Sequence, residues 1–185
     1  DLPDGGAEHI AKTVEAINRA DPSILVETLI PDFRGDVSAL KRVVESGVAV
    51  LAHNIETVRR LTPSVRDRRA DYEQSMKVLR NVKSLKADLI TKSSIMLGLG
   101  ETESEVIQTM ADLRSVGVDA LTIGQYLQPS RGHIPVTEYV NPQTFEKFRR
   151  SGEEMGFLYV ASGPLVRSSY KAGEYYLENI IRSKK

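Results

Sequence analysis

The sequence has 185 residues, of which 41% are hydrophobic and 27% charged, a composition typical of one globular domain. Basic and acidic side chains both number 25, and the resulting zero net charge argues against nucleic-acid binding through an excess of basic residues. No apolar run approaches the roughly 20 residues that span a bilayer, and there is no cysteine to form a disulfide or to supply a thiolate ligand.

The chain opens on a loop, because Pro3 and the pair Gly5-Gly6 are typical of turns. An α/β domain usually starts with a strand, so we expect this chain to begin inside a larger protein. Stretches of β-branched residues then alternate with segments that carry apolar residues at helical spacing. The first half is expected to hold a helix at Ala7–Ala20, a strand at Ile24–Ile30, a helix with Asp36 as its N-cap that ends at Gly47, a strand at Val48–Ala52 and a short helix at Glu56–Leu61.

The second half continues the alternation, with clear signals at the helix starts. Asp71 is a good N-cap, Thr102 and Glu105 form a capping box, and Asn141 precedes Pro142 at a first helical position. These signals predict helices from Asp71 through Val82, from Thr102 to Gly117 and from Asn141 to Gly156, strands at Asp88–Leu97, Ala120–Leu127 and Phe157 to about Ala161, and a long polar loop at Gln128–Tyr139.

Five strands separated by helical crossovers predict a parallel sheet with right-handed connections. The arrangement is either a doubly wound sheet or a full or partial (β/α) barrel, and in both the functional groups lie at the C-terminal ends of the strands. The polar residues collected there are Glu27, Asp32, Asn54, Glu56, Lys92, Ser94, Gln125, Tyr126, Arg167, Ser168 and Ser169.

Most members of this polar set have two interpretations. Glu27 and Lys92 are either site residues or a buried ion pair that fixes the strand register. Asn54 and Glu56 are two residues apart, so on a strand they face the same side. Such a pair suits a ribose diol or an ammonium group, and the alternative is a capped loop turn.

Three further groups of residues need an interpretation. The run Gly98-Leu99-Gly100-Glu101 lacks the third glycine of a dinucleotide fingerprint, so it is either a plain turn or a place where a ligand approaches the backbone. Three arginines, Arg66, Arg68 and Arg69, either clamp an anion or form a solvated charge run. The histidines are assigned no chemistry: His53 is expected to pack in the interior and His133 to be solvated.

The hydroxyls near the C-terminus, Ser168 and Ser169, have no histidine near them in sequence to act as a base. The neighbouring Arg167 would lower the pKa of a serine hydroxyl only somewhat. A bound metal would lower it far more, to the point of alkoxide ligation. A Ser–His–Asp triad is not excluded but has no positive support, so the role of these hydroxyls stays open at this point.

The chain resembles the lipoyl synthase family of radical S-adenosylmethionine enzymes. The matching sequence motifs span the chain from end to end and occur in the same order as in the family. The Arg-Ser-Ser-Tyr motif is the most specific of them. They are Asp1–Gly6, Pro31–Gly35, Ala52–Thr57, Val65–Ala70, Lys92–Glu101, Gly124–Pro129 and Gly163–Ala172. The family also carries a CxxxCxxC triplet and a CxxxxCxxxxxC triplet upstream, and their absence here implies the C-terminal half to two-thirds of such an enzyme.

The resemblance implies an incomplete (β/α) TIM-type barrel, a radical SAM core, over residues 1–162, followed by a C-terminal segment over 163–185. It makes Ser168 a ligand of an auxiliary [4Fe-4S] cluster and hence a catalytic and metal-binding residue. By the same resemblance Asn54 and Glu56 contact the ribose of S-adenosylmethionine and Arg69 its carboxylate. Gly5-Gly6 takes the place of the motif that meets the methionyl amine, although the glutamate of that motif is missing.

The activity implied is the insertion of two sulfur atoms at C6 and C8 of a protein-bound octanoyl chain by a 5′-deoxyadenosyl radical. The cofactors implied are two [4Fe-4S] clusters, whose cysteine ligands lie outside this chain, and S-adenosylmethionine. The partner would be an octanoylated lipoyl carrier, either a glycine cleavage H protein or the E2 subunit of a 2-oxoacid dehydrogenase. The location would be mitochondrial in a eukaryote, which is favoured, or cytoplasmic in a bacterium.

Two other functions remain open from the residues. One is a metal-free α/β domain that binds a carrier protein without catalysis. The other is a barrel aldolase or lyase in which Lys92 forms a Schiff base. On the favoured interpretation the present chain alone is expected to be inactive and poorly stable, because it can build neither cluster and leaves a sheet edge exposed.

Overall fold

The computed structural model describes residues 2–168, 179 and 181. Ser169 and most of the residues after it lie outside the described residues, so the predicted segment 163–185 is described mainly up to Ser168. Among the described helices, none is both long enough and apolar enough to cross a bilayer.

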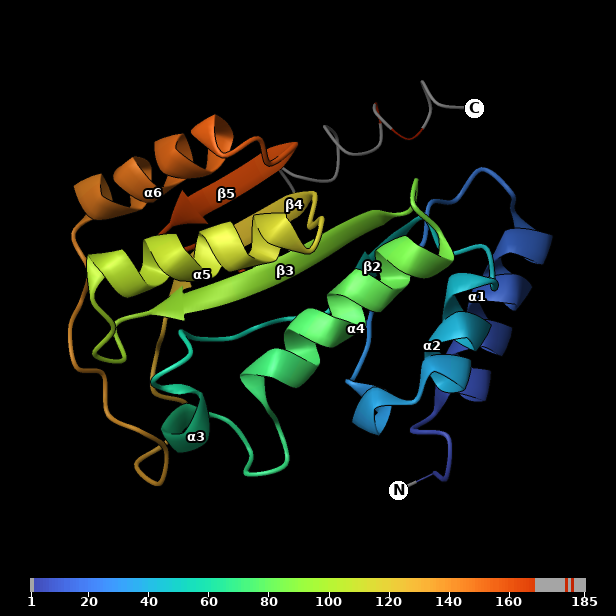
Figure 1. The fold of residues 1–185 in the computed structure, drawn as a ribbon, viewed down its shortest axis with the longest axis horizontal. Coiled ribbons are helices and arrows are strands. Elements are labelled where there is room, and N and C mark those ends of the chain that lie inside the picture. Colours follow the sequence, from blue (N-terminus) through green and yellow to red (C-terminus); the bar gives the residue numbers. More distant parts are fainter. Residues whose placement is uncertain (1, 169–178, 180, 182–185) are drawn as a thin grey trace.

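The fold is a five-stranded sheet in which every neighbouring pair of strands is parallel (Figure 1). The spatial order of the strands equals their order in the chain, so all crossovers advance in one direction, as in a (β/α) barrel; a doubly wound sheet would reverse direction. The strands are β1 (Glu27–Leu29), β2 (Val50–Ala52), β3 (Ile90–Leu97), β4 (Ala120–Gln125) and β5 (Tyr159–Gly163). Within the described residues the barrel does not close, since β1 and β5 each pair with a single strand.

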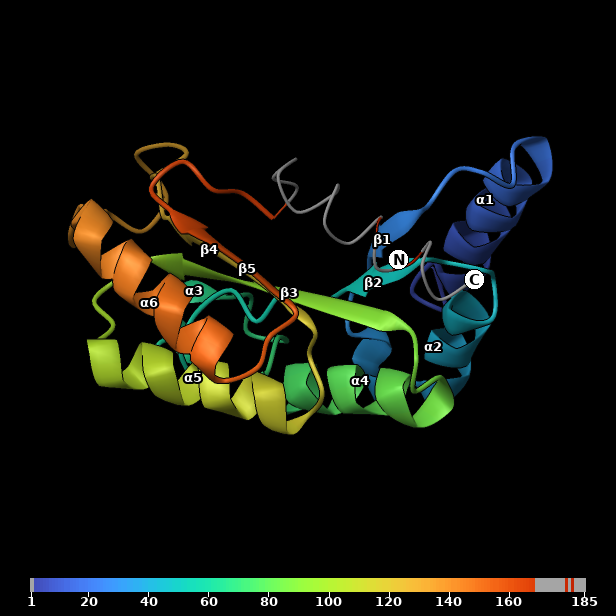
Figure 2. The same ribbon diagram turned by 90° about the horizontal axis from the view of Figure 1, so that it is seen from above.

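Helices cover one face of this sheet. Figure 2 shows α4, α5 and α6 along that face, with α1 and α2 beside β1 and β2. The helical elements are α1 (Ala7–Ala20), the single turn η1 (Phe33–Gly35), α2 (Val37–Val44), α3 (Thr62–Val65), α4 (Tyr72–Leu85), α5 (Glu103–Ser115) and α6 (Pro142–Glu154). The capping predictions are confirmed: Asp36, Asp71, Thr102 and Asn141 each accept a backbone N–H in the first turn.

The two faces of the sheet differ in chemistry. Fully buried apolar side chains such as Ile95, Leu121 and Ile123 point toward the helices and form the main core with Phe145 and Phe148 of α6. The opposite face has small and polar side chains in register, because Ser94 pairs with Thr122 and Met96 with Gly124. This alternation leaves room on the concave face near the C-terminal ends of the strands.

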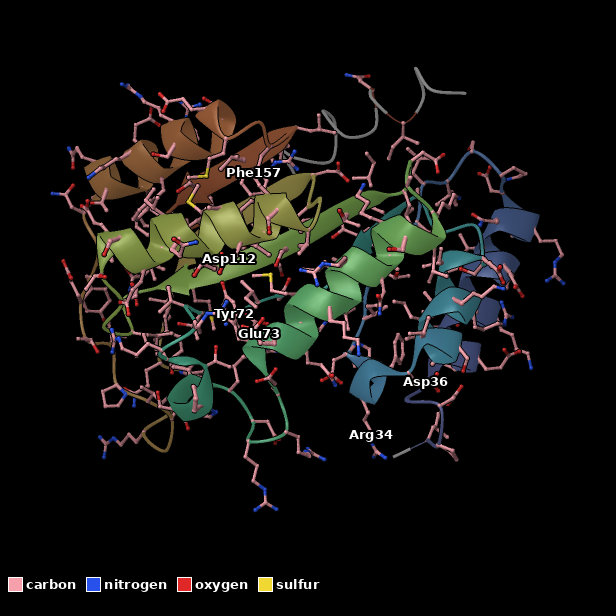
Figure 3. All side chains as sticks on the ribbon, in the orientation of Figure 1. Arg34, Asp36, Tyr72, Glu73, Asp112 and Phe157 are labelled. Atoms are coloured by element: carbon pink, nitrogen blue, oxygen red, sulfur yellow. The ribbon has the colours of Figure 1, made fainter. Side chains whose placement is uncertain are left out.

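A polar cluster joins α4 to α5 on the helical layer. The Tyr72 hydroxyl donates to Asp112 Oδ2 at 2.9 Å, and the Arg59 guanidinium lies 4.3 Å from the centre of the Tyr72 ring. Figure 3 shows Tyr72, Glu73 and Asp112 gathered between the two helices. Burial and the Asp112 carboxylate both raise the pKa of Tyr72, so the phenol stays protonated and keeps donating.

Three sequence predictions are wrong in their boundaries. The strand expected at Ile24–Ile30 is shorter in the structure, where β1 has only three residues, Glu27–Leu29. Ile24 is exposed, and this edge strand pairs with a neighbour on one side only. The short helix expected at Glu56–Leu61 instead occupies Thr62–Val65, because Glu56 continues the sheet as a bridge to Ile95. The last strand ends at Gly163 rather than near Ala161.

Candidate active site

Two neighbouring cavities open at the C-terminal ends of the strands, and they share Asn54 and Glu56. The arginine cavity has a volume of about 470 Å³ and the serine cavity about 240 Å³. The arginine cavity is lined by Leu29, Ile30, Pro31, Asp32, Arg34, His53, Asn54, Glu56, Arg66, Asp67, Arg69, Ala70 and Gln74. The serine cavity is lined by Asn54, Glu56, Ser94, Ile95, Met96, Gly124, Gln125, Tyr126, Leu127, Pro129, Val166, Arg167 and Ser168.

The shared wall is built by the chain that leaves β2 and runs beside β3. The Glu56 N–H donates to the Ser94 carbonyl at 3.0 Å, and the Glu56 carbonyl accepts from the Met96 N–H at 2.8 Å. Between the two polar residues, Ile55 points the other way and is fully buried in the core. Asn54 and Glu56 therefore face the same side, where the Asn54 amide lowers the pKa of the Glu56 carboxyl.

Glu56 occupies an unusual backbone conformation and a partly buried position. Its φ of 67° lies in the left-handed region, which non-glycine residues seldom adopt and which is concentrated at functional sites. Burial raises the pKa of the Glu56 carboxyl, and the hydrogen bond from Asn54 and the charge of Arg66 lower it in part. Partial burial strengthens the attraction of this carboxylate for hydrogen-bond donors on a ligand.

His53 lies beneath the arginine cavity and has a packing role, as predicted. It is 3% exposed, and its Nδ1 and Nε2 are each 3.0 Å from an oxygen, the Ile30 carbonyl and the Ser75 hydroxyl. The carbonyl can only accept, so Nδ1 carries the proton and Nε2 accepts from Ser75. Burial lowers the pKa of the imidazole, which agrees with this neutral tautomer.

The arginines of the 66–69 run differ in how they are held. Arg66 is half-buried, and its Nη1 donates to the Ser75 hydroxyl at 2.9 Å, so the His53–Ser75 pair fixes the guanidinium on the cavity wall. Arg69 also lines the arginine cavity, but its side chain is 78% exposed and paired with Asp67 at 2.9 Å. This pairing holds the pKa of Asp67 down at about 2. The geometry favours Arg66 as the cation that faces a ligand.

Gly5 and Gly6 lie beside the arginine cavity in a separate hollow of about 280 Å³. The arginine cavity and this hollow are both lined by Pro31, Asp32 and Arg34. Both glycines have left-handed φ values, 63° and 86°, and a Cβ on Gly5 would come within 2.9 Å of the Phe33 ring. Figure 3 shows the Arg34 side chain extending away from the body of the molecule.

The Gly98–Glu101 motif is a closed turn. The Glu101 carboxylate accepts from the backbone N–H groups of Gly98 and Leu99, at 2.5 Å and 2.9 Å. A Cβ on Gly98 would lie 2.3 Å from the Glu138 carbonyl. The turn interpretation is therefore favoured over close ligand approach.

Glu27 and Lys92 form the ion pair that was one of their two interpretations. The Lys92 ammonium lies 2.8 Å and 3.0 Å from the two Glu27 oxygens, and its side chain is 7% exposed. Lys92 is the third residue of the eight-residue β3, well before the strand end. An ammonium held by a carboxylate lacks the free electron pair that a Schiff-base nucleophile needs, so this interpretation is disfavoured.

Ser168 reaches the serine cavity through a turn that follows β5. The Val166 N–H donates to the Gly163 carbonyl at 3.0 Å, and Arg167 Nη1 donates to the Gln125 carbonyl at 3.3 Å. Among the residues that the structure describes, none is hydrogen-bonded to the Ser168 hydroxyl. A half-buried hydroxyl that faces a cavity without such a partner fits an oxygen ligand for a group bound there.

The described residues do not form a metal site by themselves. No group of three or more histidine or acidic side chains is gathered there as a set of ligands. The sequence also has no cysteine, so Ser168 could be at most one of several ligands.

The fold and the polar edge define the class of protein. Residues 1–113 match the model of the radical SAM superfamily, and the chain belongs to this superfamily. A radical S-adenosylmethionine methyltransferase from Kitasatospora setae, TsrM, shares the fold with a TM-score of 0.50 and 13% identity, over 76% of this chain and 27% of its own. The HMG-CoA lyase of Bacillus subtilis also shares it, with a TM-score of 0.51 and 13% identity, over 87% of this chain and 61% of its own.

The most specific similarity is to lipoyl synthases. The chain is 59% identical over 184 residues to the mitochondrial lipoyl synthase of Aedes aegypti, covering 100% of this chain and 47% of that protein. It is 59% identical to the chloroplastic lipoyl synthase 2 of Zea mays and 56% identical to the apicoplast lipoyl synthase of Plasmodium vivax, of which it covers 50% and 42%. The chain thus spans about half the length of these relatives.

Proposed function

We propose that this chain is the C-terminal part of a lipoyl synthase, an enzyme that inserts two sulfur atoms at C6 and C8 of a protein-bound octanoyl chain. The whole-chain similarity to lipoyl synthases at 56–59% identity supports the assignment. The structural observation that supports it most is that Asn54 and Glu56 line both cavities and form the wall between them. One cavity has the groups for a charged nucleoside cofactor, and the other has the Ser168 hydroxyl, which has no hydrogen-bond partner among the described residues.

The arginine cavity suits S-adenosylmethionine in its chemistry. The Glu56 carboxylate accepts from hydroxyls, and the Asn54 amide both donates and accepts, which together match a ribose diol. The half-buried Arg66 is placed to pair with the methionyl carboxylate, with Arg69 as an outer, solvated partner. Gly5-Gly6 lies in the adjoining hollow, where backbone rather than side chains would meet the methionyl amine.

The serine cavity suits one corner of an auxiliary [4Fe-4S] cluster, with Ser168 as its oxygen ligand and cysteines in the rest of the protein as the others. When bound, the two clusters of such an enzyme supply the reductive cleavage of S-adenosylmethionine and the sulfur atoms. The contribution of this chain is placement: Glu56 and Asn54 would fix the ribose on one side of a thin wall and Ser168 would lie on the other. An alkoxide is a harder ligand than a thiolate, so its bond to iron should open more readily.

The same proposal gives the partner and the location. The substrate is an octanoyl group on a lipoyl carrier, either a glycine cleavage H protein or an E2 subunit of a 2-oxoacid dehydrogenase. Relatives at this level of identity are named for mitochondria, chloroplasts and the apicoplast. We accordingly place a eukaryotic form in an organelle, with the mitochondrion favoured, and a bacterial form in the cytoplasm.

The proposal is tested in the full-length protein with reconstituted clusters and an octanoylated carrier. Ser168→Ala should abolish formation of the lipoyl group. Ser168→Cys should keep the cluster, measured as iron and sulfide per chain, but slow sulfur insertion by about tenfold or more, which corresponds to roughly 1.4 kcal/mol in the barrier. Ser130→Ala, in an exposed loop, is the control and should behave like the wild type. Unchanged rates in both Ser168 variants would overturn the role of this hydroxyl.

A further inference from the structure

One glycine in the middle of the sheet has no part in the chemistry above, although it lies directly under the segment that carries Ser168. Gly124 is the fifth residue of β4 and is paired on one side with Met96 and on the other with Gly163. Glycine weakens a strand interior and often marks a place where another backbone approaches closely. The residue that approaches here is Val166.

The approach is too close for any side chain. A Cβ at Gly124 would lie 2.2 Å from the Val166 carbonyl oxygen and 3.2 Å from the carbon of that carbonyl. The φ of Gly124 is not in the left-handed region, so its backbone could accommodate alanine. Among the described residues, the obstacle to a side chain is therefore the segment that crosses above Gly124.

Gly163 provides a natural comparison at the same level of the sheet. It is the cross-strand partner of Gly124, and it also has an ordinary φ. Within the part of the chain that the structure describes, a Cβ on Gly163 would meet only the Val166 side chain, at 3.4 Å, an ordinary van der Waals distance. The two glycines thus touch the same residue, but only one of them excludes a methyl group.

Three contacts hold the crossing segment down on Gly124. The turn from Gly163 to Val166 is closed by a backbone hydrogen bond of 3.0 Å. Arg167 Nη1 then donates to the Gln125 carbonyl at 3.3 Å and to the Val166 carbonyl at 3.1 Å, so the guanidinium ties the segment to the residue after the glycine. Two residues beyond Val166, Ser168 faces the serine cavity.

We infer that Gly124 is a positioning residue for Ser168: the missing side chain lets the Val166 carbonyl rest on β4, and Arg167 clamps it there. This inference rests on the proposed function of Ser168 as a cluster ligand. A methyl group at position 124 forces the carbonyl back by about 1 Å before ordinary contact distance is reached. Ser168, two residues further along the chain, then moves with this carbonyl, and a misplacement of about 1 Å at a reacting group can cost on the order of 100-fold in rate.

The test uses the full-length protein carrying Gly124→Ala, with Gly163→Ala as the matched control and Ser168→Ala as the reference for a lost ligand. We expect Gly124→Ala to alter the Mössbauer signature of the auxiliary-cluster iron that carries the oxygen ligand, and to slow sulfur insertion by about 10- to 100-fold. Gly163→Ala should keep the wild-type spectrum and rate. The melting temperature of each cluster-free variant shows whether the fold is intact.

The outcomes separate the two proposals. If Ser168→Ala has the wild-type spectrum and rate, the proposed role of Ser168 fails and the inference fails with it. If Ser168→Ala is impaired while a folded Gly124→Ala matches the wild type, only the positioning inference is overturned. If Gly124→Ala fails to fold, Arg167→Gln tests the same clamp: it should change the spectrum, while a wild-type spectrum in this variant would contradict the inference.

Discussion

At the scale of single residues, this edge of the sheet depends on which polar groups are already occupied. Glu101 and Lys92 have their partners within the described chain, and Arg69 is paired with Asp67. Arg66 is oriented by Ser75, and Ser168 has no hydrogen-bond partner among the described residues. The groups available to a ligand are therefore fewer than the polar residues that the sequence places at the strand ends.

The two arginines of the arginine cavity can be told apart by substitution. Arg66→Gln in the full-length protein should weaken S-adenosylmethionine binding by about tenfold or more, since a charge-assisted hydrogen bond contributes roughly 1.5–3 kcal/mol. Arg69→Gln, the matched control, should change the dissociation constant little, because that side chain is exposed and paired with Asp67. Calorimetric titration would measure both, and a larger loss in Arg69→Gln would reverse the assignment.

Glu56 should make stability depend on pH in a defined direction. Burial raises the pKa of this carboxyl above its ordinary value of 4.5, so the folded state binds the proton more tightly than the unfolded chain. The favourable contribution is complete below about pH 4.5 and is lost as the pH rises through the folded pKa. Glu56→Gln should therefore raise the melting temperature of the cluster-free protein at pH 7 and have little effect near pH 4.

The same variant should bind S-adenosylmethionine less tightly, because the amide replaces one of the carboxylate oxygens that accept from the ribose. A gain in stability together with a loss in binding is the expected signature of a strained functional residue. A melting temperature of the Glu56→Gln variant below that of the wild type at pH 7 would contradict this account.

At the scale of elements, the loop between β4 and α6 is held by one buried side chain. The two Nε2 hydrogens of Gln125 are shared among the carbonyls of Leu97, Tyr126 and Glu138, at 3.0 to 3.1 Å, and its Oε1 accepts from the Val140 N–H at 2.9 Å. The amide thereby joins two strand ends to the far end of the loop. This loop supplies Leu127 and Pro129 to the serine cavity.

Replacing Gln125 with leucine should loosen this loop. The change leaves buried backbone groups without partners, at a cost of roughly 1–3 kcal/mol for each group that water cannot reach. Trypsin cleavage after Arg131, which is exposed in the loop, should become faster in the full-length variant. Gln128→Leu is the control and should be cleaved at the wild-type rate, because the Gln128 amide donates to the exposed His133 carbonyl at 2.7 Å and to no other described residue.

At the scale of the whole molecule, the described strands form an open sheet with α4, α5 and α6 along one face (Figure 2). The concave face bears the ion pair of Glu27 with Lys92 and a satellite apolar cluster of Val50, Ile90 and Ala120. Exposed apolar residues gather beside the edge strand β1, where Leu29 is 56% and Ile24 is 47% exposed. Surfaces of this kind are covered in a closed barrel, so the chain by itself carries an aggregation liability.

Expressed alone, the chain should therefore bind no iron–sulfur cluster after anaerobic reconstitution, since it has no cysteine and its described part gathers no set of three other ligands. Iron and sulfide assays should give background values, while the full-length protein treated in parallel should bind both. Iron bound in stoichiometric amounts by the chain alone would contradict the assignment of the missing ligands to the rest of the enzyme.

Much of the fold could be predicted from local signals. The capping residues Asp36, Asp71, Thr102 and Asn141 marked four helix starts correctly, because a cap depends on its immediate neighbours. The ends of β1 and β5 were predicted less well, since strand ends depend on pairing with distant residues. The short helix was misplaced because no local pattern signalled the left-handed turn of Glu56 or its bridge to Ile95.

The sequence alone determined the alternation of strands and helices, the parallel sheet and the set of polar residues at the strand ends, all of which follow from periodicity and composition. Only the tertiary structure decided the one-way strand order, the wall shared by two cavities, the choice of Arg66 over Arg69 and the contact of Val166 with Gly124. These features join residues far apart in the chain, and their distances depend on strand register and crossover direction. A sequence pattern cannot contain such distances, because they arise only when all the elements pack together.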